Sequence, residues 1–159
     1  MRTTFVHAFV SNRLDCCNSL LAGVSNQLLQ RMQVVQNVAA RLVTRARRSE
    51  HMSPILRDLY WLPVRQRIVF KTAVLAYKFT HDMAPEYFQV YCQPMSTVVC
   101  RRLRSADFGR LAVPRTRTSH DDRSFSVQGP WNSLPDELRT SGVGLHMFRR
   151  KLKTFLFNV

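Results

Sequence analysis

The sequence predicts a mainly α-helical protein, a helical bundle with a small arginine-rich β ribbon placed before its last helices. Apolar residues recur every three or four positions over most of the chain, which is the period of an amphipathic helix. Hydrophobic residues make up 45% of the 159 residues, enough to build a core. We expect a helical bundle over residues 1–92, a basic loop or β ribbon over 93–128 and docking helices over 129–159, together forming one domain.

An antiparallel helical hairpin is predicted for the first third of the chain. One apolar stripe runs from Val6 to Leu21, and Gly23 suits the end of that helix. Ser25 is a suitable N-cap for a second helix with its own apolar stripe. This second stripe comprises Leu28, Met32, Val35, Ala39 and Leu42. A helix of this pattern turns its stripe toward a core, and the short connection favours antiparallel packing.

Four arginines follow at the end of the second predicted helix: Arg41, Arg45, Arg47 and Arg48. Cations at this position complement the negative end of the helix dipole. A cluster of four exceeds what capping requires, so contact with a polyanion is an alternative interpretation that stays open.

Two prolines mark the next helix starts. Ser53 and Pro54 predict a short helix, with the serine as cap and the proline at the first helical position. Pro63 predicts another start in the same way, and residues 68–79 are apolar nearly all round, as in a central helix. Trp61 between them is expected to fill the core at this elbow. Residues 85–92 are expected to add a further helical turn or two.

Residues 101–123 hold seven arginines and three acids, and apolar residues thin out there. Arg102 and Arg104 would lie on one side of an extended chain, because side chains alternate along a strand. Arg115 and Arg117 repeat this spacing. The complementary inward positions are Phe125 and Val127. This pattern predicts a two- or three-stranded ribbon whose outer arginines straddle a phosphate backbone, and a disordered basic loop is the alternative.

The last third predicts two helices that dock on the bundle. Trp131 precedes Leu134-Pro135, after which Asp136 and Glu137 suit the first turn of a helix. A final helix begins near Leu145, and its apolar stripe comprises Leu145, Phe148, Leu152 and Phe155. The rest of that helix carries Arg149, Arg150, Lys151 and Lys153 with no acid among them. A basic amphipathic helix is compatible with nucleic acid, with a membrane surface or with a partner that binds such helices.

The charge balance indicates a polyanionic partner. Lysine and arginine number 24 against ten acids, which gives a net charge of +14. Such a field favours encounter with RNA or DNA, while an anionic membrane, an acidic protein or mere solubility are alternatives. We expect the cations to form one ordered face. The candidate nucleic-acid-binding residues are Arg45, Arg47, Arg48, Arg102, Arg104, Arg115, Arg117, Arg149, Arg150, Lys151 and Lys153.

No catalytic, metal or cofactor site is predicted. Glycine-rich phosphate loops, G-x-S-x-G and H-E-x-x-H patterns are absent from the sequence. His120, Asp121 and Asp122 are expected to form turn hydrogen bonds and ion pairs with neighbouring arginines. The four cysteines at 16, 17, 92 and 100 show no metal spacing, and we expect buried thiols in a reducing compartment.

The location predicted for the chain is intracellular, nuclear or cytoplasmic. No stretch approaches the roughly 20 apolar residues that span a bilayer. The first residues lack the order of a signal peptide, and their helical period continues to residue 22, which disfavours a transit peptide.

Several blocks in order carry a resemblance to one family. They are FVHAFVSNRLDCCNSLLAG, RMQVVQNVAARLVT, LRDLYWLPVRQRIVFKTAVLAYK, VPRTRT, DRSFSV, WNSLPDELR and FRRKLKTFLF. Over almost its whole length the chain resembles the segment after the reverse transcriptase core in polyproteins of non-LTR retrotransposons, LINE elements of the jockey and chicken-repeat type. The resemblance implies RNA-directed DNA synthesis for the parent polyprotein. The polymerase aspartates of the family lie upstream and the endonuclease is absent, so the resemblance assigns no catalytic residue here.

The chain departs from the family pattern at two places. Cys17 stands where the family usually shows tyrosine, and one or two residues are missing between Pro130 and Trp131. The deletion predicts poor docking of the carboxyl-terminal helix, and such drift fits a decayed, non-functional genomic copy. Two hypotheses follow: a non-catalytic segment that binds the RNA or DNA backbone, or a structural module whose arginines pair with acids of a reverse transcriptase core.

Overall fold

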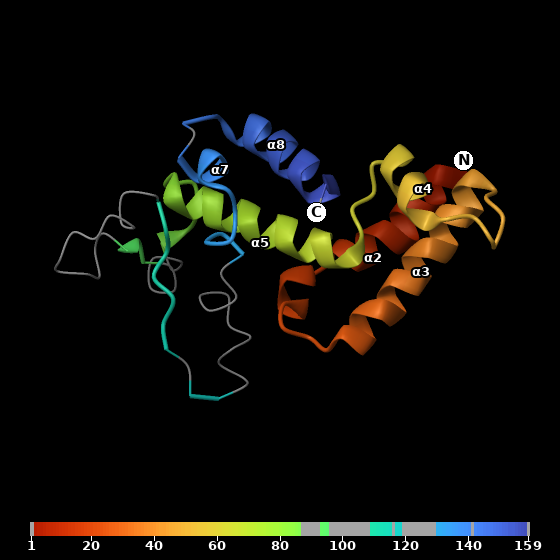
Figure 1. Cartoon of the computed structure of the whole chain (residues 1–159), viewed down its shortest axis with the longest axis horizontal. Helices are drawn as coiled ribbons and strands as arrows, with labels where there is room; N and C mark the ends of the chain where they lie inside the picture. Colours follow the sequence, from red (N-terminus) through yellow and green to blue (C-terminus); the bar gives the residue numbers. More distant parts are fainter. Residues whose placement is uncertain are drawn as a thin grey trace.

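The computed structural model is mainly helical, as the sequence predicts (Figure 1). The structure describes residues 2–86, 93–95, 109–115, 117–118, 130–140 and 142–158. Two apolar clusters organise these residues. One lies among the first helices, α3 and α4, and the other joins α5, α7 and α8. Among the described helices, none is long and apolar enough to span a bilayer.

The amino-terminal helix is interrupted, whereas the sequence predicts a continuous one up to Leu21. It consists of α1 (Arg2–Val6), a π-helical turn (His7–Ser11) and α2 (Asn12–Asp15), followed by a 3₁₀ turn (Asn18–Leu21). The break falls at Cys17, whose φ of 52° is left-handed. Beyond it the chain turns so that Asn18 is buried. Because the buried residue Asn18 is polar, the apolar stripe ends at this point.

The predicted burial of the cysteines is wrong for the two that the structure describes. Cys16 and Cys17 are free and exposed, because both lie at the turn that interrupts the helix. Their sulfur atoms are 3.9 Å apart, and the thiol of Cys16 raises the pKa of Cys17. Cys92 and Cys100 lie outside the described residues.

Helix α3 (Asn26–Thr44) begins after Ser25 as predicted, and it packs against α1, α4 and α5. The face that it turns inward coincides with the predicted stripe only in part, at Ala39 and the half-buried Met32. Ala39 and Ala40 are buried with Gln36, whereas three members of the stripe are exposed: Leu28, Val35 and Leu42. The two alanines allow the neighbouring helices to approach closely, and Gln36 finds a buried hydrogen-bond partner, so packing favours this side.

Helices α4 (Met52–Asp58) and α5 (Val64–Thr80) begin near the predicted prolines. Helix α4 starts one residue before Ser53, with His51 as the capping residue. Pro63 precedes the first residue of α5. Trp61 is 3% exposed in the cluster with Ala39, Ala40 and Leu56, which confirms its predicted place in the core.

The carboxyl-terminal helices dock firmly, contrary to the expectation drawn from the missing residues before Trp131. Helix α7 (Asp136–Thr140) leads to α8 (Leu145–Asn158), which runs along α5. Trp131 is 1% exposed, and its indole N–H donates to the Gly109 carbonyl at 2.7 Å. Phe148 is fully buried and stacks on Tyr77 at 4.2 Å between ring centroids. The indole enters the core from a turn, so the short connection before Trp131 does not prevent the docking of the carboxyl-terminal helices.

The arginine-rich ribbon is not found in the described residues. Over 93–95, 109–115 and 117–118 there is one isolated antiparallel bridge, between Pro94 and Leu111, and no strand. Both backbone groups of Leu111 bond instead to the Asn132 side chain, at 3.0 and 2.8 Å. Pro114 also lacks the N–H that a strand would need. The remaining ribbon positions, Arg102, Arg104, Phe125 and Val127, lie outside the described residues, as do His120 to Asp122 and most of residues 85–92.

Candidate nucleic-acid interface

The predicted cations that the structure describes are exposed, except for the half-buried Lys153, and they lie in three separate places (Figure 1). Arg45, Arg47 and Arg48 lie at the end of α3. Arg115 and Arg117 lie on the segment drawn in teal, away from α3 and α8. The third group lies on α8 and comprises Arg149, Arg150, Lys151 and Lys153. The prediction of one shared face is therefore wrong for these residues.

The group at the end of α3 is partly used for local structure. Arg45 is the left-handed C-cap of the helix, and its N–H donates to the Arg41 carbonyl at 2.7 Å. The Arg41 guanidinium donates to the Arg48 carbonyl at 3.3 Å, and the Arg47 N–H donates to the Glu50 carboxylate at 2.9 Å. The side chains of Arg45, Arg47 and Arg48 are exposed and available to an anion.

The end of α4 projects a tyrosine that the sequence prediction did not select. Tyr60 follows the helix with a φ of 56°, in the left-handed position where helices usually place glycine. Its N–H donates to the Arg57 carbonyl at 2.9 Å, and the Trp61 N–H donates to the Leu56 carbonyl at 2.8 Å. These two bonds form a Schellman motif. Because the motif turns Trp61 into the core beside Leu56, the ring of Tyr60 is left 72% exposed.

Helix α8 brings a predicted cation to this ring. The ammonium group of Lys153 lies 5.4 Å from the ring centroid of Tyr60, a cation–π contact. Phe157, one turn further, meets the same ring edge-on at 6.4 Å. The ring and the ammonium group border a cleft of about 140 Å³, which we call the Tyr60 cleft. Its lining comprises Asp15, Tyr60, Leu62, Arg67, Phe70, Lys71 and Lys153.

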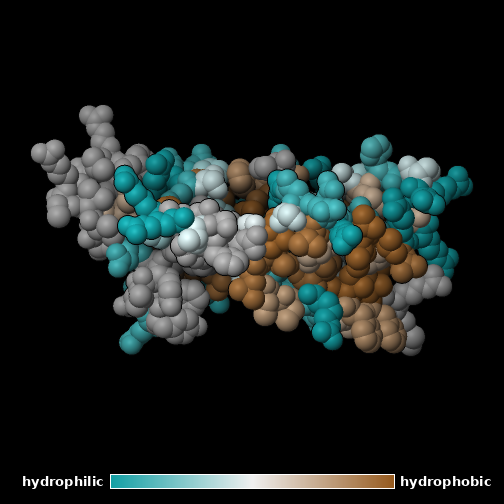
Figure 2. Space-filling view, turned by 90° about the horizontal axis from the view of Figure 1, so that it is seen from below, coloured by the Kyte–Doolittle hydropathy of each residue, from teal (hydrophilic) through white to brown (hydrophobic). Residues whose placement is uncertain are grey.

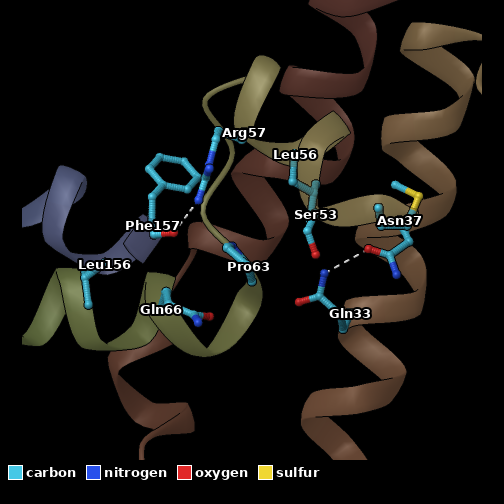
Figure 3. Close-up of a pocket in the computed structure, with 10 residues that line it drawn as sticks. Gln33, Asn37, Ser53, Leu56, Arg57, Pro63, Gln66, Leu156 and Phe157 are labelled. Carbon is cyan, nitrogen blue, oxygen red and sulfur yellow. Dashed lines mark hydrogen bonds between the residues drawn. The ribbon is translucent and has the colours of Figure 1, made fainter. Parts of the chain in front are cut away.

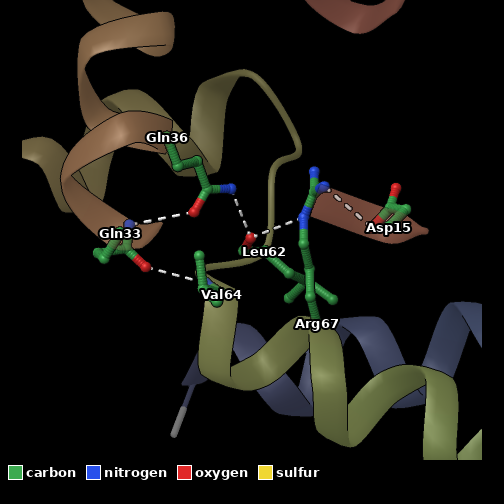
Figure 4. Close-up of polar contacts among 6 residues, drawn as sticks. All are labelled: Asp15, Gln33, Gln36, Leu62, Val64 and Arg67. Atoms are coloured by element: carbon green, nitrogen blue, oxygen red, sulfur yellow. Dashed lines mark hydrogen bonds and ion pairs between the residues drawn. The ribbon is translucent and has the colours of Figure 1, made fainter. Parts of the chain in front are cut away.

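The floor of the Tyr60 cleft is fixed by a polar network (Figure 4). The Leu62 carbonyl accepts hydrogen bonds from Gln36, at 2.8 Å, and from Arg67, at 3.2 Å. The Gln33 side chain accepts the free N–H of Val64 at 2.9 Å, where α5 begins. Arg67 also pairs with the Asp15 carboxylate at 3.0 Å, so the one acid of the cleft is already neutralised. Three cations thus face one paired acid.

Helical spacing extends the cations beyond the cleft. Arg67, Lys71 and Lys78 lie on one stripe of α5, because positions four and eleven residues apart share a face of a helix. Arg149 and Lys153 lie one turn apart on α8 in the same way. Since α5 and α8 pack together, the two stripes form a basic edge on this helix pair. Lys71 and Arg149 are exposed on it.

The electrostatics of Lys153 reflect this excess of positive charge. Partial burial lowers the pKa of Lys153 from its usual value, and the neighbouring Arg67 lowers it further. Asp15 acts in the opposite direction as a smaller influence. A bound anion would offset the repulsion from Arg67 and raise the pKa of Lys153 again.

A larger pocket of about 470 Å³ lies between α3, α4, α5 and α8 (Figure 3). Amide and hydroxyl groups line it, and they include Gln33, Asn37, Ser53 and Gln66. The Gln33 amide donates to Asn37 at 2.9 Å, and Arg57 at the rim donates to the Phe157 carbonyl at 2.9 Å. The first of these bonds lies within α3 and the second joins the end of α4 to α8, so the polar groups of this pocket take part in contacts that stabilise the helices.

In the described part of the chain, no group of three or more His, Cys, Asp or Glu side chains is placed to hold a metal ion. Comparison of the sequence with protein-family models and with curated proteins, and of the structure with solved structures, finds no match.

Sequence reasoning missed Tyr60, Lys71 and Arg67. The pattern Leu-Tyr-Trp-Leu-Pro did carry a usable signal, because two adjacent aromatic residues at a helix end cannot both enter the core. The meeting of Tyr60 with Lys153 had no such signal, since 93 positions separate them and only the docking of α8 brings them together.

Proposed function

We propose that this chain is a non-catalytic carboxyl-terminal segment of a retrotransposon RNA-directed DNA polymerase polyprotein, and that it binds the backbone of RNA or DNA. The family assignment rests on the sequence blocks that resemble LINE elements. The binding site rests on one observation, an exposed aromatic ring with a cation over its face and further cations in the same cleft.

The combination suits a single-stranded nucleic acid. Bases stack on exposed aromatic rings, and cations beside the ring take the adjacent phosphates. Tyr60 supplies the ring, while Lys71 and Lys153 supply charges that no acid of the cleft neutralises. The basic edge of α5 and α8 then offers a path for the phosphates on either side.

The first test is the salt dependence of binding. Each phosphate contact contributes a slope of about −0.7 to log K against log salt for a single strand. Lys71→Gln should therefore weaken binding of a single-stranded oligonucleotide and make the slope shallower by roughly that amount, as measured by fluorescence anisotropy at several salt concentrations.

Lys151→Gln is the matched control, because Lys151 is an exposed cation on α8 that faces away from Lys153 by its spacing. It should change the slope less than Lys71→Gln does. Binding that is insensitive to salt in the unaltered protein, or an equal loss in both variants, would contradict the proposal.

A further inference from the structure

The amino-terminal helices expose an unusual amount of apolar surface. Of the twelve large apolar side chains found exposed in the described residues, eight lie within the first 42 positions. They are Phe5, Phe9, Leu20, Leu28, Val34, Val35, Val38 and Leu42. Figure 2 shows hydrophobic surface gathered over the half of the molecule that holds these helices. Soluble proteins rarely leave such a patch uncovered, and a patch of this kind marks an interaction site.

On helix α3, exposed residues of this surface lie in two parallel rows. Successive members of a row are seven residues apart. One row is Leu28, Val35 and Leu42, which are 49%, 52% and 63% exposed. Beside it lie Arg31 and Val38, also seven residues apart, and Arg45 follows as the C-cap just beyond the last turn. We call these six residues the α3 seam. A seven-residue repeat in two adjacent rows is the pattern with which one helix packs along another. From Leu28 to Leu42 the seam runs for about four turns, roughly 21 Å at the rise of an α-helix.

The neighbouring helix widens the apolar surface. α1 and the π-helical turn pack on α3, with Val6 and Val10 toward the buried alanines. Phe5 and Phe9 point outward instead, 64% and 69% exposed, with their rings stacked at 6.1 Å. A third helix could pack against the exposed apolar groups of these two adjoining helices.

Charge selects the kind of helix. The first 49 residues contain seven arginines and a single acid, Asp15, which is already paired with Arg67. A second copy of the chain would bring two such basic faces together and is disfavoured by their repulsion. A purely apolar helix would leave Arg31 and Arg45 unneutralised beside it.

A bilayer fits the seam less well than a helix does. Arg31 lies on the same side of α3 as Val38 and beside Leu28 and Val35, so its charge interrupts the apolar surface and does not flank it. A membrane-bound helix keeps its cations at the sides of its apolar face. A partner helix can place a carboxylate opposite each arginine and an apolar residue opposite Val38.

We propose that the α3 seam is a docking surface for an amphipathic helix of a partner protein, with apolar residues along its centre and carboxylates opposite Arg31 and Arg45. This site is distinct from the Tyr60 cleft and does not depend on nucleic-acid binding. The partner helix would cover the exposed apolar residues of the stripe predicted for α3.

The test uses the full chain and two labelled helical peptides, identical except for glutamates or lysines at the positions flanking a leucine heptad stripe. We expect the glutamate peptide to bind about tenfold or more tightly than the lysine peptide in fluorescence anisotropy, because paired charges set partner choice along such seams. Val35→Ser should weaken the glutamate peptide at least severalfold. Met147→Ser is the control, since Met147 is exposed on α8.

Arg31→Glu provides the sharper outcome, because it should reverse or abolish the preference for the glutamate peptide. Each variant changes an exposed side chain, and an unchanged melting curve checks that it folds. Equal binding of the two peptides would overturn the proposal. Two other outcomes would also overturn it, provided that neither peptide binds. One is binding to anionic phosphatidylserine vesicles that Val35→Ser abolishes, and the other is self-association in sedimentation that Val35→Ser abolishes.

Discussion

Lys153 is the residue whose protonation should report binding most directly. Burial and Arg67 place its pKa below the usual lysine value. The charged form is thus disfavoured in the folded protein, which lowers the free energy of unfolding while both states are protonated. The loss in the free energy of unfolding disappears as the pH rises from the lowered pKa to the usual lysine value of about 10.4.

A phosphate bound beside Lys153 should raise its pKa again, so binding takes up a proton in this window. We expect the affinity for oligo(dA) to fall as the pH rises above the lowered pKa of the free protein, in anisotropy titrations from about pH 7 to 10. Lys153→Arg keeps the charge and removes the titration, and should flatten this part of the profile. A profile identical in the two proteins would place the phosphates elsewhere.

Tyr60 separates binding from stability. Tyr60→Asn keeps a residue that tolerates the left-handed backbone, which relieves on the order of 1 kcal/mol of strain. It also removes the cation–π contact with Lys153, worth about 0.5–1 kcal/mol at an exposed site. The two effects nearly cancel, so urea unfolding should change by less than about 1 kcal/mol.

Binding of a single strand by Tyr60→Asn should nevertheless weaken by about 1–3 kcal/mol, the value of a lost base-stacking contact. Tyr60→Phe retains the ring and should bind nearly as well as the unaltered protein. Full affinity in Tyr60→Asn would show that no base stacks on this ring.

Helix α3 and the α4–α5 loop depend on one buried amide. Gln36 is 1% exposed and donates to the Leu62 carbonyl, which fixes the floor of the Tyr60 cleft. Gln36→Met keeps the volume but removes the donor, and it leaves the Gln33 amide without one of its partners. We expect a loss of about 1–3 kcal/mol in the free energy of unfolding, the usual cost of an unmade buried hydrogen bond.

Gln30→Met on the exposed face of α3 is the matched control and should stay within about 0.5 kcal/mol of the unaltered protein in urea unfolding. If the two variants unfold alike, the Gln36 network contributes nothing to the fold.

At the scale of the whole molecule, the elements with strong local signals could be predicted from the sequence. Ser25 and Pro63 mark helix starts, Trp61 fills the core, and the α8 stripe through Phe148 and Leu152 is buried. Each depends on a cap, a proline or a helical period, which act within a few residues.

Features that depend on contacts between residues distant in the sequence could not be predicted from it. The apolar period of α3 cannot tell which of its two sides faces the bundle, because alanines and a buried glutamine compete there with larger apolar groups. The alternation of Arg115 and Arg117 indicates an extended chain but cannot show that Asn132 takes the hydrogen bonds of Leu111. The Tyr60 cleft forms only when α4, α5 and α8 have met.

The net charge of +14 is also distributed differently from the expected single face. Two described groups, at the end of α3 and at residues 115–117, lie away from the cations of the Tyr60 cleft (Figure 1). A long strand could therefore touch several basic regions, while the aromatic ring and the cleft select where a base is held.

Cross-linking of a 4-thiouridine-substituted single-stranded RNA, followed by mass spectrometry of the peptides, tests the binding site most directly. We expect cross-links at Tyr60 and on the adjacent peptides of α5 and α8 that carry Lys71 and Lys153, and we expect these cross-links to be lost at high salt. Cross-links confined to the end of α3 and to residues 115–117, with none at Tyr60, would contradict it.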